Sequence, residues 1–401
     1  MHPFLKANIL LPQGVCLEKW SVIACDQFVS QPEYWVQVRQ NVGDAPSSLN
    51  LILPEADLEG DCDGAISQIN RTMEQYLNGN IFRLYPDSYI YVERTLLNGA
   101  IRQGVVGMVD LEQYDYHPQS QSAIRATEQT VAERIPPRMN IRRDAALELP
   151  HVLLLCDDEE KILLQSLEAK KQTLPLLYDF QLMQGGGNIR GYLVSGPDAE
   201  EFDEKLALYG QAMAKKYGQN PVMYAVGDGN HSLASAKGCF EENKACVNAR
   251  FALVELENIH DDSQVFEPIH RIVKNTDPHA LLQAMEQAIG KESGTAIHWQ
   301  IGDQKGTIYV HSDEGLLPVG IVQNFLDDYM KTAPGVIDYI HGEDATCQLS
   351  QVSGTIGLIM PPVEKNAFFQ GIIAGGTLPR KTFSMGHAQE KRYYLEARKI
   401  K

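Results

Sequence analysis

The chain has 401 residues, of which 44% are hydrophobic and 22% are charged, and its formal net charge is −17. This composition is typical of a globular protein that is long enough for two lobes. A surface this acidic argues against binding to nucleic acid or to an anionic membrane, because phosphate groups are neutralised by Lys and Arg. A small anionic substrate in a local basic pocket remains compatible with it.

The seven cysteines include no Cys-x-x-Cys spacing and no zinc-binding pattern, so we expect reduced thiols. The first residues lack the apolar segment of a secretory signal, and no apolar stretch reaches the length of a membrane span. These observations predict a cytoplasmic protein whose partner is a small molecule. Assembly into a homo-oligomer is compatible with the sequence.

Hydrophobic periodicity and turn residues predict helices and strands that alternate loosely along the chain. This order favours an α+β fold, with mixed sheets and flanking helices, over a doubly wound parallel sheet. We expect two interlocked lobes, 1–220 and 221–401, joined near Gly218-Gln219-Asn220-Pro221. The main predicted elements are a helix at 65–77, strands at 89–97 and 105–111, helices at 123–133 and 198–217, a strand at 222–226, a helix from 230, a strand at 251–256, and helices at 279–289, 321–330 and 364–373.

The first stretch with chemical content is rich in arginine, with five Arg between positions 125 and 143. Arg matches phosphate oxygens in a bidentate manner, so these side chains are candidate phosphate ligands. The alternative is a solvated helix with Glu–Arg pairs worth a few tenths of a kcal/mol. If the helical spacing continues through the stretch, Thr127, Thr130 and Arg134 share one face. The candidate residues of the stretch are Arg125, Thr127, Glu128, Thr130, Arg134 and Arg138.

The most informative stretch is Tyr224–Lys237, where an apolar strand ends in Gly-Asp-Gly and a helix begins at once. The start of a helix carries unpaired N–H groups and about half a positive charge, so it suits an anion. Asp228 would repel that anion unless a metal or a proton-donating substrate lies between them. The alternative is a tight turn capped by Asp228 or Asn230, worth ~1 kcal/mol. The candidates here are Gly227, Asp228, Gly229, Asn230, His231 and Ser232.

Two further basic segments follow this turn. Gly375–Ser384 combines a glycine-rich break with Pro-Arg-Lys-Thr, which suits a phosphate-contacting loop, and its candidates are Lys381 and Thr382. The alternative is an exposed basic loop. His270 and Arg271 are further candidate cofactor ligands, and the alternative is that this pair, which precedes an apolar residue, holds a loop by hydrogen bonds.

Over nearly its whole length the chain resembles the domain-of-unknown-function family 1015, which is widespread in bacteria and archaea. The resemblance rests on the order of five short motifs. They are Val22-Ile23-Ala24-Cys25-Asp26, Ile124-Arg125-Ala126-Thr127-Glu128-Gln129-Thr130, Tyr224–Ser232, Pro268-Ile269-His270-Arg271 and Leu378-Pro379-Arg380-Lys381-Thr382-Phe383.

The central family signature is Asp-Gly-His-His-Arg after an apolar strand, where this chain has Asp228-Gly229-Asn230-His231-Ser232. That signature is similar to the one in the ParB/sulfiredoxin-like superfamily, whose turn binds nucleotide phosphates. The chain lacks the sulfiredoxin Cys at position 230, and its charge argues against the DNA-binding branch. The free-serine-kinase branch uses an Asp in this turn and a separate Glu, which Asp228 and Glu128 could supply.

The resemblance therefore implies a nucleotide-dependent kinase for a small molecule like a hydroxy amino acid, or a related phosphate-handling enzyme. Its cofactors would be ATP or ADP, or another nucleotide, with Mg²⁺ at Asp228. Asp228, His231 and Glu128 are the expected catalytic residues. Two alternatives stay open: a nucleotide or metabolite sensor without catalysis, which Ser232 in place of Arg favours, and a scaffold in which the turn is structural.

Overall fold

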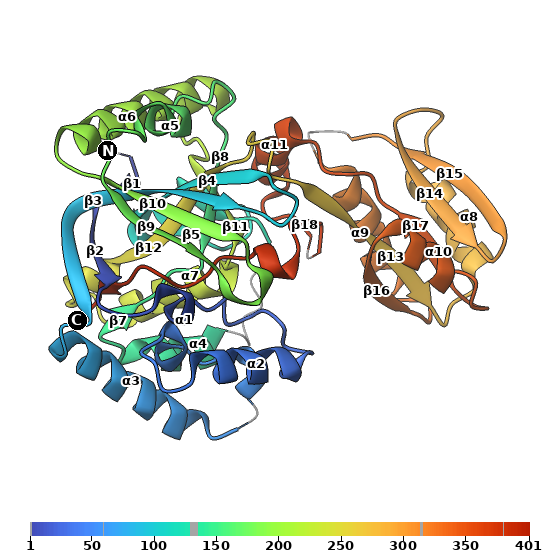
Figure 1. Cartoon of the computed structure of the whole chain (residues 1–401). Helices are drawn as coiled ribbons and strands as arrows, with labels where there is room; N and C mark the ends of the chain where they lie inside the picture. Colours follow the sequence, from blue (N-terminus) through green and yellow to red (C-terminus); the bar gives the residue numbers. More distant parts are fainter. Residues whose placement is uncertain (1, 59, 129–134, 313–315, 380) are drawn as a thin grey trace.

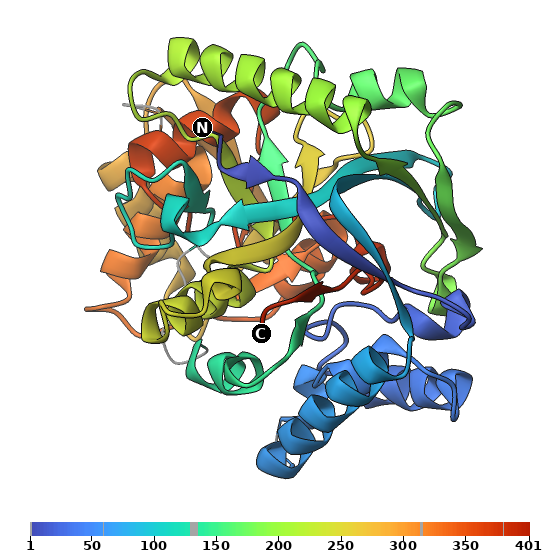
Figure 2. The same ribbon diagram turned by 90° about the vertical axis from the view of Figure 1, so that its left-hand side faces the viewer.

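The computed structural model of the protein describes residues 2–58, 60–128, 135–312, 316–379 and 381–401. A larger and a smaller body lie side by side (Figure 1). The larger body holds the N-terminal two thirds of the chain together with the C-terminal segment, and the smaller body holds the segment drawn in orange. Turned by 90°, the larger body has helices on opposite sides of a strongly twisted sheet (Figure 2).

The larger body is built on a mixed sheet that has 11 strands within the described residues. Its central strands pair both ways, since β11 is parallel to β6 and antiparallel to β8. The strands in spatial order are β5 (Tyr114–Asp115), β6 (Ile124–Ala126), β11 (Tyr224–Asp228), β8 (Leu153–Cys156), β12 (Phe251–Asn258), β4 (Ile101–Asp110), β3 (Phe82–Thr95), β10 (Asn188–Val194) and β9 (Leu176–Gln181), with β1 (Phe4–Leu5) on β4 and β2 (Ala7–Pro12) on β3.

The smaller body is built on a second sheet. A two-stranded sheet, called the ribbon, joins the C-terminal residues to the larger body. The second sheet has the order β15 (Gln304–Val310), β14 (Thr295–Ile301), β17 (Ile356–Ile359), β13 (Phe266–Lys274) and β16 (Val336–His341), with β18 (Phe383–Met385) paired to β13. The ribbon joins β7 (Leu147–Glu148) to β19 (Arg398–Lys399).

Helices flank both sheets, so the predicted α+β architecture with mixed sheets is confirmed. None of the helices in the described part of the chain has the length and apolar character needed to cross a membrane. The helices are α1 (Leu17–Trp20), α2 (Pro32–Val42), α3 (Cys62–Asn78), α4 (Ile135–Arg143), α5 (Leu164–Lys170), α6 (Pro197–Tyr217), α7 (Asn230–Glu242), α8 (Pro278–Ile289), α9 (Pro318–Tyr329), α10 (Glu343–Leu349) and α11 (Lys365–Gly375).

The two bodies share a continuous apolar core. Leu155 and Ala225, on β8 and β11 of the larger sheet, belong to the same buried cluster as Phe266 and Phe383 on the strands that lead to the smaller body. The change from one sheet to the other falls between β12 and β13, later than the boundary at residue 220 expected from sequence. The reason is that β11 and β12 both pair with β8 in the larger sheet.

The segment after the second sheet returns to the larger body. β18 runs antiparallel to the first residues of β13, and Ala397 exchanges backbone hydrogen bonds with Leu10 of β2. The C-terminal residues therefore pass along the junction of the two bodies before they reach the far side of the sheet (Figures 1 and 2).

The helix predicted over 123–133 is wrong at its start. Residues 124–126 form β6, which pairs in parallel with Tyr224–Val226 of β11, and all three are buried. The part of the prediction over 129–133 lies outside the described residues, and the next described helical residues, Ile135–Arg143 of α4, include Pro136 and Pro137. Tertiary pairing with β11 therefore overrides the helical spacing of this stretch.

Candidate functional site

The strand-to-helix turn predicted around Gly227–Ser232 is present. β11 reads as a continuous apolar run because Tyr224, Ala225 and Val226 are buried on both faces of a central strand. Gly229 is the N-cap of α7 with a φ of 79°, a left-handed conformation that glycine adopts without strain. No side chain caps this helix start, which differs from the capped turn considered as the structural alternative.

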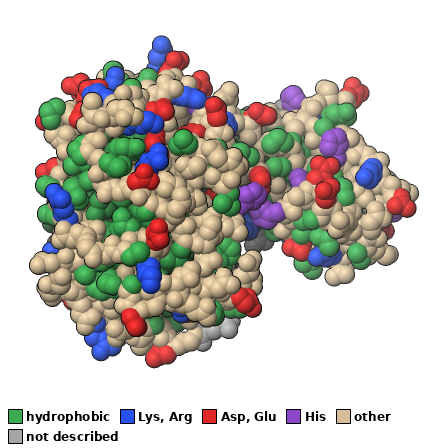
Figure 3. All heavy atoms as spheres, viewed as in Figure 1, with side chains coloured by type: hydrophobic (Ala, Val, Ile, Leu, Met, Phe, Trp, Pro, Cys, Tyr) green, Lys and Arg blue, Asp and Glu red, His purple; other side chains and the backbone are tan. Residues whose placement is uncertain are grey.

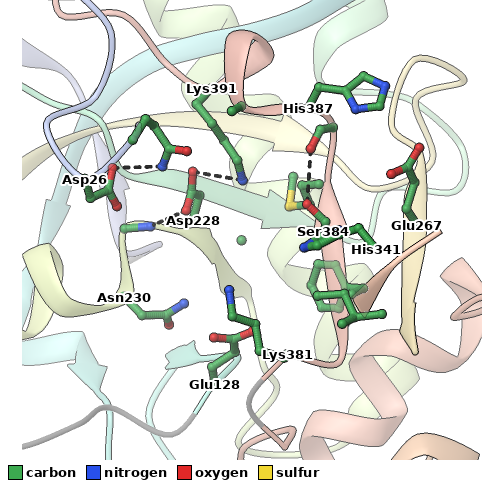
Figure 4. Close-up of a pocket in the computed structure, with 18 of the residues that line it drawn as sticks. Asp26, Glu128, Asp228, Asn230, Glu267, His341, Lys381, Ser384, His387 and Lys391 are labelled. Atoms are coloured by element: carbon green, nitrogen blue, oxygen red, sulfur yellow. Dashed lines mark hydrogen bonds and ion pairs between the residues drawn. The ribbon is translucent and has the colours of Figure 1, made fainter. Parts of the chain in front are cut away.

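The turn opens on a cleft of about 990 Å³ between the two bodies. Histidine side chains gather where the bodies meet (Figure 3), and charged side chains of both signs point into the cleft (Figure 4). The ionisable side chains that line it are Asp26, Glu55, Glu128, Arg138, Asp228, His231, Glu267, His341, Lys381, His387 and Lys391.

Asp228 is held between the helix start and the C-terminal segment. Its Oδ1 accepts a hydrogen bond from the Gly229 N–H at 3.1 Å, and its Oδ2 lies 3.3 Å from Nζ of Lys391. Both side chains are mostly buried, with 18% and 14% of their surfaces exposed. Lys391 thus places a positive charge beside the carboxylate that the sequence left without a partner (Figure 4).

Asp26 is a second carboxylate on the same side of the cleft. Burial opposes ionisation of Asp26, but His151, a hydrogen bond from Gln27 and the charge of Lys391 together hold its pKa below the usual range. The side chain therefore carries its charge at neutral pH. Asp26 follows the apolar run Val22–Ala24 and belongs to the first family motif, which is the signal by which it could have been chosen from sequence.

Glu128 behaves in the opposite way. Burial, together with the negative charge of Asp228, raises the pKa of Glu128 above its usual value, although Lys381 counteracts this. The backbone around it is fixed, since the Leu378 N–H donates to Thr127 O at 2.7 Å and Glu128 bridges to Leu378. A buried carboxyl with a raised pKa can hold or release a proton nearer to neutral pH, as a general acid or base must.

The cleft gathers nine of the residues expected from sequence. Asn230 is also tied back to β6, because its side-chain oxygen accepts from the Thr127 N–H at 3.2 Å. Arg138 forms an ion pair with Glu55. The nine are Glu128, Arg138, Gly227, Asp228, Gly229, Asn230, His231, Ser232 and Lys381.

Arg125 and Thr127 do not line the cleft. Both are buried by the pairing of β6 with β11, and their polar atoms bind backbone carbonyl groups. The Arg125 guanidinium donates to the carbonyl oxygens of Ser122 and Asn220, and the Thr127 hydroxyl donates to that of Val226 at 2.6 Å. These two side chains therefore stabilise the strand β11 that leads into the turn.

His270, Arg271 and Thr382 are also structural. The Met360 N–H donates to Nδ1 of His270 at 3.0 Å, and Arg271 is fully buried with its Nε 3.1 Å from Gln323. The Thr382 hydroxyl donates to the carbonyl oxygen of Pro379. All three side chains are buried and do not line the cleft, so the expected role of these residues as cofactor ligands is wrong.

Thr130 and Arg134 lie outside the described residues.

Several lining residues were not among the sequence candidates. Glu267 and His341 come from β13 and β16 of the smaller body, and His387 and Lys391 come from the C-terminal segment. Glu267 and His341 have no local signal of a site, whereas His387 and Lys391 follow the basic loop predicted at Gly375–Ser384. Only the return of the chain along the junction brings them opposite the turn.

Ser232 occupies the place of the family arginine and has an unexpected partner. Its hydroxyl lies 2.8 Å from Nε2 of His151, and the other ring nitrogen of that histidine lies 2.8 Å from the Tyr394 hydroxyl. Ser232 therefore brings a hydrogen-bonded imidazole to the start of α7 in place of a guanidinium. The positive charge on this wall comes from Arg138 and Lys391.

Metal ligands in the cleft would be carboxylate oxygens. Asp228, Asp26 and Glu128 provide the hard oxygen donors that Mg²⁺ prefers, so the residues present fit that ion. Another acidic group, Asp157 with Glu159 and His260, lies away from the cleft. Its possible ligand atoms are within 4.8 Å of one another, but the Lys216 ammonium already binds both carboxylates.

Residues 10–400 match the model of the family described as "Protein of unknown function (DUF1015)". The chain belongs to this family. A search of curated protein sequences gave no match. The match confirms the family that the order of the motifs had indicated.

Several solved structures are similar to this DUF1015 chain, but with low sequence identity and low TM-scores. A free serine kinase in complex with AMP is 11% identical, covers 73% of this chain and 91% of its own, and has a TM-score of 0.38. SbnI with a C-terminal truncation, from Staphylococcus aureus, is 13% identical over 70% and 83%, with a TM-score of 0.37. A conserved hypothetical protein from Pyrococcus furiosus is 13% identical over 72% and 90%, with a TM-score of 0.33. Similarities at this level carry no argument about function.

Proposed function

We propose that this protein is a nucleotide-dependent kinase for a small hydroxylated molecule, or a related phosphate-handling enzyme, and that the cleft is its active site. The observation that carries the proposal is the meeting of opposite charges at one helix start. The uncapped beginning of α7, the carboxylates of Asp228 and Glu128, and the ammonium groups of Lys381 and Lys391 all face the same cleft.

Phosphate groups would bind at the start of α7. The first N–H groups of a helix have no partner within the helix, and the helix dipole favours negative charge there. Lys381 and Lys391 would offset the charge that develops on the phosphate oxygens, because phosphoryl transfer depends mainly on positioning and electrostatic stabilisation. Arg138, on the same wall, adds a further positive charge to this part of the cleft.

The carboxylates would handle the substrate hydroxyl and the metal. Asp228 would accept the hydroxyl proton or, with Asp26, hold Mg²⁺ that arrives with ATP or ADP. When bound, Mg²⁺ neutralises charge on the nucleotide phosphates. Glu128 would take part in proton transfer through its raised pKa. Lys391 would orient Asp228 through the ion pair between them.

The test is product formation by the purified full-length chain with ATP, ADP or CTP, Mg²⁺ and a panel of hydroxy amino acids, read by phosphorus NMR. We expect Asp228→Asn to lower turnover on the order of 10³-fold with the melting temperature retained. Asp262→Asn is the matched control, because the Asp262 side chain is 98% exposed. Turnover in Asp228→Asn equal to the unmodified chain would overturn the catalytic role.

The sensor alternative gives a different result in the same experiment. Ser232 in place of the family arginine favours it, since a hydroxyl supplies no positive charge to a transferring phosphate. Nucleotide binding by calorimetry, with no product from any member of the panel, would identify a sensor. Absence of nucleotide binding would exclude both functions.

A further inference from the structure

A second cavity, of about 150 Å³, lies behind the wall of the cleft. Most of its lining is hydrocarbon, contributed by the loop before α3, by α3, α4 and α7, by β7 and the segment that joins it to β8, and by β12. Representative lining residues are Leu51, Leu53, Met73, Ile141, Val152 and Leu253.

The cavity and the cleft share part of their walls. Three residues, Glu55, Arg138 and Ser232, line both spaces. Ser232 stands in the first turn of α7, so the shared wall adjoins the helix start that would receive phosphate. The side chains of Glu55, Arg138 and Ser232 therefore stand between the two spaces, and a molecule that extends from one into the other would pass beside them.

Most polar side chains in the lining of the cavity already have protein partners. Arg142 is paired with Glu148, and both ring nitrogens of His151 are hydrogen-bonded. Among the described residues, no buried side-chain atom left without a hydrogen-bond partner belongs to this lining. A mostly apolar space of about 150 Å³ is large enough for a group the size of benzene.

We propose that this cavity receives a hydrocarbon group, aliphatic or aromatic and of about six carbons, from the same compound whose anionic or hydroxyl end lies in the cleft. The substrate class is then a hydroxylated compound with an apolar side chain. The placement of the substrate's anionic or hydroxyl end in the cleft rests on the proposed function. The existence of the apolar cavity does not depend on that function. An empty cavity of this size weakens a fold because its lining loses dispersion contacts, and a substrate group restores them.

The first experiment measures binding of methyl, n-propyl, n-butyl and benzyl phosphate to the full-length chain by calorimetry. Each methylene that enters the cavity should raise the affinity about fourfold. Ala236→Leu, which adds volume to the lining, should abolish this increase while methyl phosphate binds as before. Ala212→Leu on the exposed face of α6 is the matched control and should keep the increase.

The second experiment uses benzene alone, which tests the cavity without any anionic group. Benzene should bind in this cavity, as seen by crystallography or ligand-detected NMR, and Ala236→Leu should remove it. If Ala236→Leu does not fold, Met73→Ala provides the test by enlargement, because it should admit indole, which the unmodified chain excludes.

The outcomes separate this proposal from the function of the cleft. Methyl phosphate binding without any gain from a longer chain overturns the cavity proposal and leaves the anion site intact. No binding of any alkyl phosphate, together with benzene in the cavity, overturns the anion site and the link between the two spaces. No benzene in the cavity overturns the proposal outright.

Discussion

The ammonium group of Lys391 lies 3.3 Å from the carboxylate of Asp228, so the C-terminal segment is joined to the end of the central strand β11 at the wall of the cleft. Asp228 has two fixed neighbours, the Gly229 N–H on one oxygen and Lys391 on the other. This pair connects the motif that defines the family to a residue that lies in none of the motifs.

Replacement of Lys391 should separate catalysis from stability. Lys391→Met should lower turnover by about 10²- to 10³-fold, because a positive charge beside Asp228 and the phosphate site is lost. It should lower the free energy of unfolding by about 1–3 kcal/mol, because the mostly buried Asp228 carboxylate keeps the Gly229 N–H but loses its cation. Kinetics and urea unfolding measure the two effects. Lys391→Arg keeps the charge and should retain more activity than Lys391→Met; equal activity in the two variants would contradict the prediction.

The segment that carries Lys391 is positioned by a buried arginine. The Arg94 guanidinium donates to the carbonyl oxygens of Gly186, Gln389, Glu390 and Lys391, at distances from 2.6 to 3.1 Å. Arg94→Met removes this donor from the carbonyl oxygens of Gly186, Gln389 and Lys391, while that of Glu390 keeps the Arg102 guanidinium. We therefore expect a loss of about 3–5 kcal/mol in the free energy of unfolding, measured by urea denaturation.

The control for Arg94 is Arg190→Met on the neighbouring strand β10. Arg190 pairs with Asp179, but its side chain is 49% exposed, so this change should cost less than about 1 kcal/mol. If both variants lose the same stability, the special role of Arg94 is refuted.

The turn should not tolerate a side chain at Gly229. A Cβ there would lie 3.0 Å from Cγ2 of Val152, in addition to the strain of a positive φ. We expect Gly229→Ala to cost about 3 kcal/mol and to weaken nucleotide binding. Gly99→Ala is the control, since Gly99 has a φ of 82° but open space around it, and should cost about 1 kcal/mol. Equal losses would mean that contact with Val152 is unimportant.

The raised pKa of Glu128 predicts a pH-dependent stability. Because burial favours the neutral form, folding loses stability as the pH rises from the unfolded-state value of about 4.5 through the higher pKa of the folded state. Glu128→Gln removes this loss, so the variant should be more stable than the unmodified chain at neutral pH and similar to it below pH ~4. Thermal unfolding over a pH series measures this, with turnover expected to fall in the same variant.

Asp157 provides a control of opposite sign. Burial opposes its ionisation, but His260, Lys216 and Tyr217 lower its pKa below the usual value, so its contribution to stability is present above pH ~4 and is lost as the pH falls through the folded-state pKa. Asp157→Asn should therefore be less stable than the unmodified chain at neutral pH, with the deficit shrinking in acid. The same trend in both variants would contradict the assignment of the two carboxyl groups.

The local pattern of apolar and turn residues was sufficient to predict helices and strands whose buried face follows from their own sequence. The apolar run before Gly227 and the small residues after Gly229 predicted β11 and α7, and the spacing over 198–217 predicted α6. The helix predicted from residue 123 is wrong at 124–126, because the helical spacing there competes with a strand partner that is distant in sequence. Once β6 pairs with β11, Arg125 and Thr127 turn to the interior, and their side chains bind backbone rather than ligand.

The sequence by itself determined the family, the α+β class and the turn at Asp228, because these depend on motif order, periodicity and the conformational freedom of glycine. The tertiary structure decided which charges surround that turn. Asp26, Lys391 and His341 come from the N-terminal segment, the C-terminal segment and the smaller body, and they meet only because β18 and the C-terminal segment pass along the junction. Such contacts arise from long-range strand pairing and shared core packing, which no local spacing of residues encodes.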